Sequence, residues 1–277
     1  MTTETGERRI SPGWRKTAGA FLRVDVIEEI NYPLTLVMQL LGIIVPLVPF
    51  FFISELVGSS RTVGGDYLTF TVIGLGLTAA LTGAMSGFGS SLQRAFQRGT
   101  MEVFLVQPVP WTTLPLAMNQ WTLMFGALSS LLIFGVGALM GADFQMSGVP
   151  VAIVIAILGV ISSTAIGICS AAILLLTLKS APLLRLYSLA ASLLAGSIFS
   201  VDQLPTWAQY ISFALPHTYV INATRTALMD DPGTFQMSTT TAIVALVVFN
   251  IVFLTLGFYV FRRALELSRK MGTLGGY

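Results

Sequence analysis

The chain has 277 residues, of which 54% are hydrophobic and only 10% are charged, and its mean hydropathy is +0.80. Soluble domains carry about 25% charged residues, so this composition excludes a protein whose whole surface meets water. The net charge of +2 is small and favours no highly charged partner such as nucleic acid. Because α-helices satisfy their own backbone groups in lipid, the sequence predicts an all-α integral membrane protein.

The chain contains apolar runs without charged residues, and crossing a bilayer takes about 20 such residues. Gly83 and Gly87, inside the second run, have a spacing that allows helices to approach closely. We therefore predict six transmembrane helices, at Leu34–Ser54, Tyr67–Ser90, Thr113–Gly141, Val149–Leu178, Leu186–Val201 and Thr239–Phe261.

The basic residues indicate how these helices are oriented, since Lys and Arg gather on the cytoplasmic side of membrane proteins. With the N-terminus inside, every Lys and Arg except Arg61 and Arg225 falls on the cytoplasmic side. Both chain ends are then cytoplasmic. The predicted organisation is a cytoplasmic N-terminus with an interfacial helix (residues 1–32), a membrane domain (residues 33–262) and a cytoplasmic tail (residues 263–277).

A further apolar stretch, residues 204–231, follows the fifth predicted span. If it crossed the membrane, the basic tail after Phe261 would lie outside. Pro216 interrupts the stretch, and proline disfavours helix at the residue before it. We therefore predict a re-entrant hairpin at the extracytoplasmic face, made of two short helices that meet at Pro216.

None of the predicted spans contains Asp, Glu, Lys, Arg or His. Ion-coupled transporters usually need such residues as relays or ligands, so a secondary transporter is disfavoured, although sodium sites built from carbonyls stay open. The single histidine, His217, provides no metal-ligand cluster, and no phosphate-binding loop of the form G-x-x-x-x-G-K-[ST] occurs. We expect no catalytic residue, metal or cofactor in this chain, so energy for uphill transport would come from another chain.

The longest inner loop, residues 91–111, predicts an isolated helix of about two turns. Gly99 ends the preceding helix, Thr100 is a good N-cap, and Glu102 would lie in the first turn, where its charge suits the helix dipole. Pro108 and Pro110 follow the segment and end it.

Such a helix is too short to be stable alone, so we expect it to lie against a partner protein. Arg94 and Arg98 precede it, and Met101 and Leu105 give it an apolar side. The alternative is an amphipathic loop whose long side chains reach the lipid headgroups.

Two segments resemble one family, the type-2 ATP-binding-cassette exporter permeases. Arg98-Gly-Thr-Met-Glu-Val-Phe-Leu-Val-Gln-Pro-Val-Pro110 is similar to the coupling-helix motif of that family, roughly Arg/Lys-Gly-Thr-x-Glu-x-Leu-x-x-x-Pro, with Phe104 where Leu is more common. Leu204-Pro-Thr-Trp-Ala-Gln-Tyr-Ile-Ser-Phe-Ala-Leu-Pro-His-Thr-Tyr219, followed by Arg225, is similar to the segment before the last span. Both matches occur in the order expected for the family.

The resemblance implies a dimer of permease chains, identical or different, each carrying a cytoplasmic ATPase subunit that binds ATP and Mg²⁺. The segment from Trp14 to Asn31 would be the interfacial connecting helix, although Glu28 interrupts its apolar face. The residues implied to couple ATP hydrolysis to transport are Arg94, Arg98, Gly99, Thr100, Met101, Glu102 and Leu105.

The outer hairpin is expected to act as an extracellular gate beside the dimer axis. Taken singly, His217 is interpreted as a polar group at headgroup level, and Arg225 as an exposed ion pair with Asp230 and Asp231. Such a pair contributes little energy. The predicted gate residues are Phe199, Leu204, Pro205, Pro216, His217, Tyr219 and Arg225.

The leading interpretation is the permease subunit of an ATP-driven exporter in the cell membrane of a bacterium. Its uncharged spans suit an amphipathic, lipid-linked or drug-like substrate, and its partners would be an ATPase subunit, a second permease copy and membrane lipids. Two alternatives stay open: a membrane scaffold that docks a cytoplasmic partner, and an ion-coupled secondary transporter.

Overall fold

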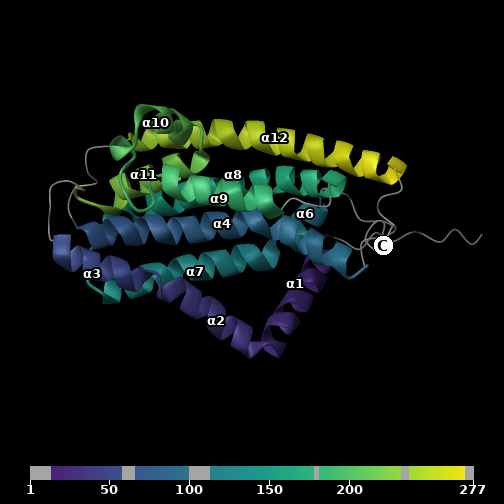
Figure 1. Cartoon of the computed structure of the whole chain (residues 1–277), viewed down its shortest axis with the longest axis horizontal. Coiled ribbons are helices and arrows are strands. Elements are labelled where there is room, and N and C mark those ends of the chain that lie inside the picture. The colour runs from purple at the N-terminus through teal and green to yellow at the C-terminus, as the bar shows by residue number, and fades with distance from the viewer. Residues whose placement is uncertain (1–13, 58–65, 100–112, 178–180, 232–236, 272–277) are drawn as a thin grey trace, which may run out of the picture.

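A computed structural model describes residues 14–57, 66–99, 113–177, 181–231 and 237–271 of the chain. Within these ranges every regular element is helical, as the composition predicted. The long helices run side by side along the longest axis of the molecule (Figure 1). Each helix pairs its own backbone groups by internal hydrogen bonds, which a bilayer requires.

In the described part of the chain, five helical segments are long and apolar enough to cross a membrane. They overlap the first, second, third, fourth and sixth predicted spans. The third begins at Gln120 rather than at the predicted Thr113, because the helix is interrupted at Asn119. The first is divided near Pro46 into two helices, because proline removes a backbone donor. The helices are α2 (Pro33–Ile44) with α3 (Leu47–Val57), α4 (Tyr67–Gln97), α7 (Gln120–Leu139), α8 (Val149–Thr177) and α12 (Thr239–Met271).

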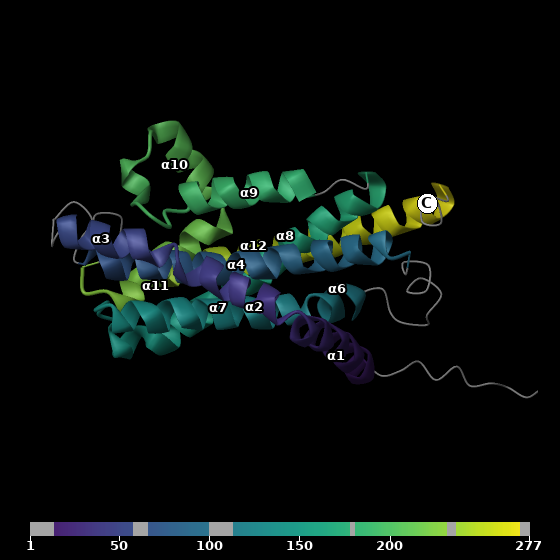
Figure 2. The ribbon, with the colours of Figure 1, turned by 60° about the horizontal axis from the view of Figure 1, so that its bottom comes forward.

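The fifth predicted span, Leu186–Val201, corresponds to a helix that both starts and ends earlier in the chain. Its helix, α9 (Ala181–Leu194), has 14 residues and is about 21 Å long, against a hydrocarbon core of about 30 Å. The predicted end at Val201 is wrong for the helix, because Gly196 adopts a φ of +82° and turns the chain. α9 nevertheless lies along the bundle (Figure 2), and the count of six crossings stays a prediction.

The N-terminal helix α1 (Trp14–Asn31) has the bounds expected for the interfacial helix. It meets α2 at Tyr32, and Pro33 occupies the first turn of α2. In Figure 1 the two helices form an open angle, with α2 leading along the bundle and α1 returning toward α6 (Thr113–Met118).

The core forms where α4 packs against α7 and α8, and where α8 packs against α12. Glycines allow these close approaches, as the spacing of Gly83 and Gly87 predicted. A Cβ on Gly83 would lie 3.1 Å from the Cα of Gly126, and one on Gly87 would lie 1.8 Å from Oδ1 of Asn119. Because glycine has no Cβ, α4 can pack closely against the third predicted span at both positions.

The charged residues lie at opposite ends of the bundle, as the orientation argument required. Arg94 and Arg98 stand at the end of α4, near the end where α12 finishes, whereas Asp66 caps the other end of α4. Its carboxylate accepts hydrogen bonds from the backbone N–H groups of Leu68 and Thr69. This cap fixes the start of the second span at the predicted outer face.

Thiol labelling tests this orientation. In a variant without Cys169, we expect Asp143→Cys and Asp231→Cys to react with an impermeant thiol reagent in intact cells, since both positions are exposed at the outer end. Gln97→Cys and Lys270→Cys should react only after permeabilisation. Ser268 is a poor position because it is fully buried. Labelling of Lys270→Cys in intact cells would contradict the cytoplasmic C-terminus.

Candidate functional site: the outer hairpin and the coupling end

The residues 204–231 form the two short helices that the sequence predicted. They are α10 (Thr206–Phe213) and α11 (Pro216–Leu228). Pro216 is buried at the first position of α11, and Pro205 is exposed at the N-cap of α10. Figure 2 shows α10 beside the end of α9, at the same end of the molecule as α3. The break between the two helices at Pro216 is therefore covered by other parts of the protein.

Hydrogen bonds within the protein close the hairpin. The hydroxyl of Thr218 donates to the carbonyl of Ser212 at 2.6 Å. The hydroxyl of Ser212 in turn donates to the carbonyl of Leu194, at the end of α9, at 2.7 Å. The hydroxyl of Tyr219 donates to the carbonyl of Phe213 at 2.9 Å. Carbonyls left free by the helix ends are thereby paired, as a site at membrane depth demands.

Arg225 joins three elements from a fully buried position. Its Nε and Nη2 donate to the carbonyl of Phe70 in α4, at 3.2 and 3.0 Å. Nη1 donates to the carbonyl of Gly196 at 2.6 Å, and Nη2 to that of Ser197 at 2.9 Å. The guanidinium carbon also lies 3.3 Å from the centre of the Phe70 ring. Arg225 thus connects α11 to α4 and to the turn after α9.

The sequence-based interpretation of Arg225 as an exposed ion pair is wrong. The side chain is 1% exposed, and its partners are backbone carbonyls rather than Asp230 or Asp231. The carboxylate of Asp230 instead accepts a hydrogen bond from the side chain of Gln145. The sequence could not show this, because the acceptors lie 29 and 155 residues away along the chain.

Gly74, which sequence reasoning missed, makes room for this arrangement. A Cβ at this position would lie 1.9 Å from the carbonyl oxygen of Ser197 and 2.7 Å from Nη2 of Arg225. Real atoms never approach that closely, so the turn after α9 can rest on α4 only where α4 has no side chain. In the sequence, nothing distinguished Gly74 from the many other glycines of the apolar runs.

His217 is buried within the protein, whereas the sequence suggested a polar group at headgroup level. Only 2% of its surface is exposed, and its ring packs edge-on against Tyr187 of α9, with the ring centres 5.8 Å apart. The side chain points into the space between α9 and α11 because it stands next to the buried start of α11. Its Nδ1 has no hydrogen-bond partner in the described part of the chain.

Phe199 and Leu204 lie between α9 and α10 and are both partly buried. The carbonyl of Leu204 accepts a hydrogen bond from the side chain of Gln209 at 2.9 Å. Trp207 and Tyr210 are exposed on α10, where interfacial aromatics are common. The place of Phe199 and Leu204 at a constriction stays a prediction, since it depends on a second copy.

At the other end of the bundle, α4 stops as predicted. Gly99 follows it with a φ of +66°, a left-handed conformation that glycine adopts without strain. The coupling residues Thr100, Met101, Glu102 and Leu105 lie outside the described residues, so the short helix and its partner stay predictions.

Arg98 connects the end of α4 to α1. Its Nη1 lies 2.5 Å from Oε1 of Glu28. The Arg98 guanidinium lowers the pKa of Glu28 below its usual value, and the carboxylate raises the pKa of Arg98. Glu28, which interrupts the apolar face of α1, therefore has a partner across the interface. Both side chains are about half exposed, so the pair contributes at most about 1 kcal/mol and chiefly fixes position.

The elements on both sides of residues 100–112 lie against α1. On one side is the end of α4, through Arg98 and Glu28. On the other is α6, which packs against α1. Phe21 of α1 also packs against a buried cluster that includes Leu92 and Met118.

Comparison with protein-family models matches residues 31–229 to the ABC-2 type transporter family. Comparison with curated proteins gives no significant match. The matched range runs from the junction of α1 and α2 to the end of the outer hairpin, so it contains the coupling end and Arg225. Since it covers well over half of the chain, the protein belongs to the ABC-2 type transporter family and is a membrane transport subunit of an ABC system.

Proposed function

We propose that this protein is the permease subunit of an exporter that a separate cytoplasmic ATPase energises by binding ATP and Mg²⁺. The observation that carries the proposal is the contact of α1 with the elements on either side of residues 100–112, through Arg98 with Glu28 and through α6. A subunit bound to that segment could move α4, and α4 packs against both α7 and α8. Movement at the cytoplasmic end would then spread through the core.

The substrate is amphipathic, lipid-linked or drug-like. Support comes from the buried surfaces of the long helices, which are apolar or carry hydroxyl groups and amides, such as Ser162 paired with Asn250. Uncharged walls give a bare ion little to bind. A second permease copy would complete the pathway, and α9 presents an exposed apolar stripe of Leu186, Leu189 and Leu193 that such a copy could cover.

Reversing one charge in the coupling segment tests the proposal. Glu102→Arg should leave the permease inserted but abolish both ATPase co-purification and ATP-driven flux, because like charges brought together at an interface cost several kcal/mol. The measurements are the subunits that co-purify with the tagged chain, and substrate flux in vesicles with and without ATP. Asp143→Arg, an acid-to-arginine change at the exposed outer end, is the matched control and should change neither.

Two results would contradict the proposal. Retention of a stoichiometric ATPase by Glu102→Arg would make the segment a headgroup anchor rather than a coupling element. Co-purification of a partner that does not bind nucleotide would favour the scaffold alternative.

A further inference from the structure

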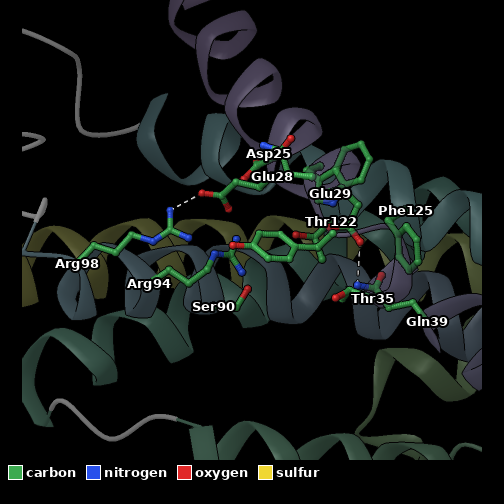
Figure 3. Close-up of a pocket in the computed structure, with 13 residues that line it drawn as sticks. Asp25, Glu28, Glu29, Thr35, Gln39, Ser90, Arg94, Arg98, Thr122 and Phe125 are labelled. Atoms are coloured by element: carbon green, nitrogen blue, oxygen red, sulfur yellow. Dashed lines mark hydrogen bonds and ion pairs between the residues drawn. The ribbon is translucent and has the colours of Figure 1, made fainter. Parts of the chain in front are cut away.

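A pocket of about 640 Å³ lies in the space between α1, α2, α4 and α7. Its lining includes no residue of the outer hairpin. Figure 3 shows side chains from α1 facing those from α4 across it, with Asp25 and Glu28 opposite Arg94 and Arg98. The volume falls within the range of small-molecule sites, about 300–1,000 Å³.

Carboxylates exceed the free cationic groups in this pocket. Glu28 is paired with Arg98, and Glu29 accepts a hydrogen bond from Nε2 of Gln39 at 2.9 Å. Asp25 is half-buried, and burial raises the pKa of its carboxyl, partly offset by Arg94. In the part of the chain that the structure describes, Asp25 has no hydrogen-bond or ion-pair partner within contact distance. Arg94 and Arg98 act on this carboxylate through charge at longer range, so a cationic ligand can still contact it directly.

Arg94 is less available to an anion. Its Nη2 donates to the hydroxyl of Ser91 at 2.8 Å, and its charge already acts on Asp25 and Glu28. Counting three acidic side chains and two arginines, the lining has an excess of one negative charge. A single positive charge would neutralise it.

The remaining walls suit the same ligand. Tyr32, Trp121 and Phe125 line the pocket, and aromatic faces attract cations, more strongly where water is excluded. Hydroxyl and amide groups of Thr35, Gln39 and Thr122 line it as well. A carboxylate together with aromatic rings is the chemistry that recognises an organic ammonium group.

α2, which bounds the pocket, also has an exposed apolar face. α2 has no buried residue. Tyr32, Thr35 and Gln39 face the pocket, whereas Leu34 and Met38 are exposed on the neighbouring face. A ligand with its charged head in the pocket could place an apolar body along this exposed face, inside the bilayer.

We infer that this pocket binds the ammonium head of a cationic amphiphile that enters from the cytoplasmic leaflet, with Asp25 as the principal counter-charge. As an entry site for export, this inference rests on the proposed function. The ammonium group has two conceivable sources, a transported amphiphile or an aminolipid of the membrane. The experiment below separates them and requires neither ATP nor an ATPase.

The test measures binding of radiolabelled decyltrimethylammonium to the full-length chain in phosphatidylglycerol nanodiscs, which contain no amine, with empty nanodiscs subtracted. We expect saturable binding of one probe per chain. Asp25→Asn should weaken it about tenfold or more, as loss of a close charge pair does. Asp143→Asn makes the same change at the exposed outer end and should leave the affinity unchanged. Glu29→Gln, a second variant, should weaken binding if Asp25→Asn does not fold.

Adding phosphatidylethanolamine to the nanodiscs identifies the source. Competition with the probe indicates that an aminolipid occupies the pocket, and absence of competition indicates a transported amphiphile. The inference is overturned if binding does not exceed that of empty nanodiscs, if decyl sulfate binds equally well, or if folded Asp25→Asn binds like the unsubstituted chain. If the probe binds saturably but ATP drives no flux of substrate, the proposed transport function is refuted and the binding site is retained.

Discussion

Arg225→Ala is expected to abolish most substrate flux while ATPase co-purification stays intact. The substitution leaves the carbonyls of Phe70, Gly196 and Ser197 without their donor and opens a cavity at a fully buried position. A buried polar group that loses its hydrogen-bond partner typically costs about 1–3 kcal/mol, and the cavity left by the side chain adds to this cost. In the unsubstituted chain these hydrogen bonds hold the turn after α9 against α4 and α11. Without them, the outer hairpin should lose its fixed position. The measurements are flux in vesicles and thermal unfolding in nanodiscs.

Arg225→Lys is the matched control. It keeps the positive charge and can reach one or two of the carbonyls, but it lacks the planar fork that serves all three. Its flux and unfolding temperature should therefore lie between those of the unsubstituted chain and Arg225→Ala. Unchanged flux in Arg225→Ala would remove the gate role of the hairpin. A joint loss of flux and ATPase co-purification would make Arg225 a residue of general folding only.

Gly74→Ala adds a single methyl group, yet it is expected to reduce substrate flux as Arg225→Ala does. The added Cβ would lie 1.9 Å from the carbonyl oxygen of Ser197, and a backbone atom cannot move aside as a flexible side chain can. Overpacking of this kind typically costs about 1–3 kcal/mol. We expect a lower unfolding temperature together with reduced flux, because α4 and the turn after α9 must separate.

Gly135→Ala serves as the control for this prediction. Gly135 also lies inside a membrane helix, α7, but a Cβ there meets no atom within 4 Å. The substitution should not lower the free energy of unfolding, since alanine favours a helix interior over glycine by about 0.5–1 kcal/mol. Equal behaviour of Gly74→Ala and Gly135→Ala would show that α4 and the turn are not in contact in the membrane.

The sequence predicted those features that depend on residues close together along the chain. Long apolar runs defined the helices, and Pro216 divided α10 from α11 where the chain breaks. Gly99 ended α4. Each of these depends on local rules of helix formation and on transfer to lipid, which need no knowledge of neighbours in space.

The sequence failed where local rules do not apply. α9 ends at Leu194 because Gly196 turns the chain, although the apolar run continues to Val201. Hydropathy measures affinity for lipid and does not distinguish a helix from a buried turn. The burial of His217 beside Tyr187 was also missed. The sequence does not show that α9 packs against the start of α11.

By itself, the sequence determined an all-helical membrane protein with its charges sorted to two ends and a hairpin before the last helix. Only the tertiary structure decided which groups the isolated charged side chains contact. Arg225 finds carbonyls in α4 and in the turn after α9, Glu28 finds Arg98, and Asp25 faces a pocket among four helices. The physical reason is that a buried charge is stabilised by whichever donors or acceptors the packing brings near, and packing is set by helices distant in sequence.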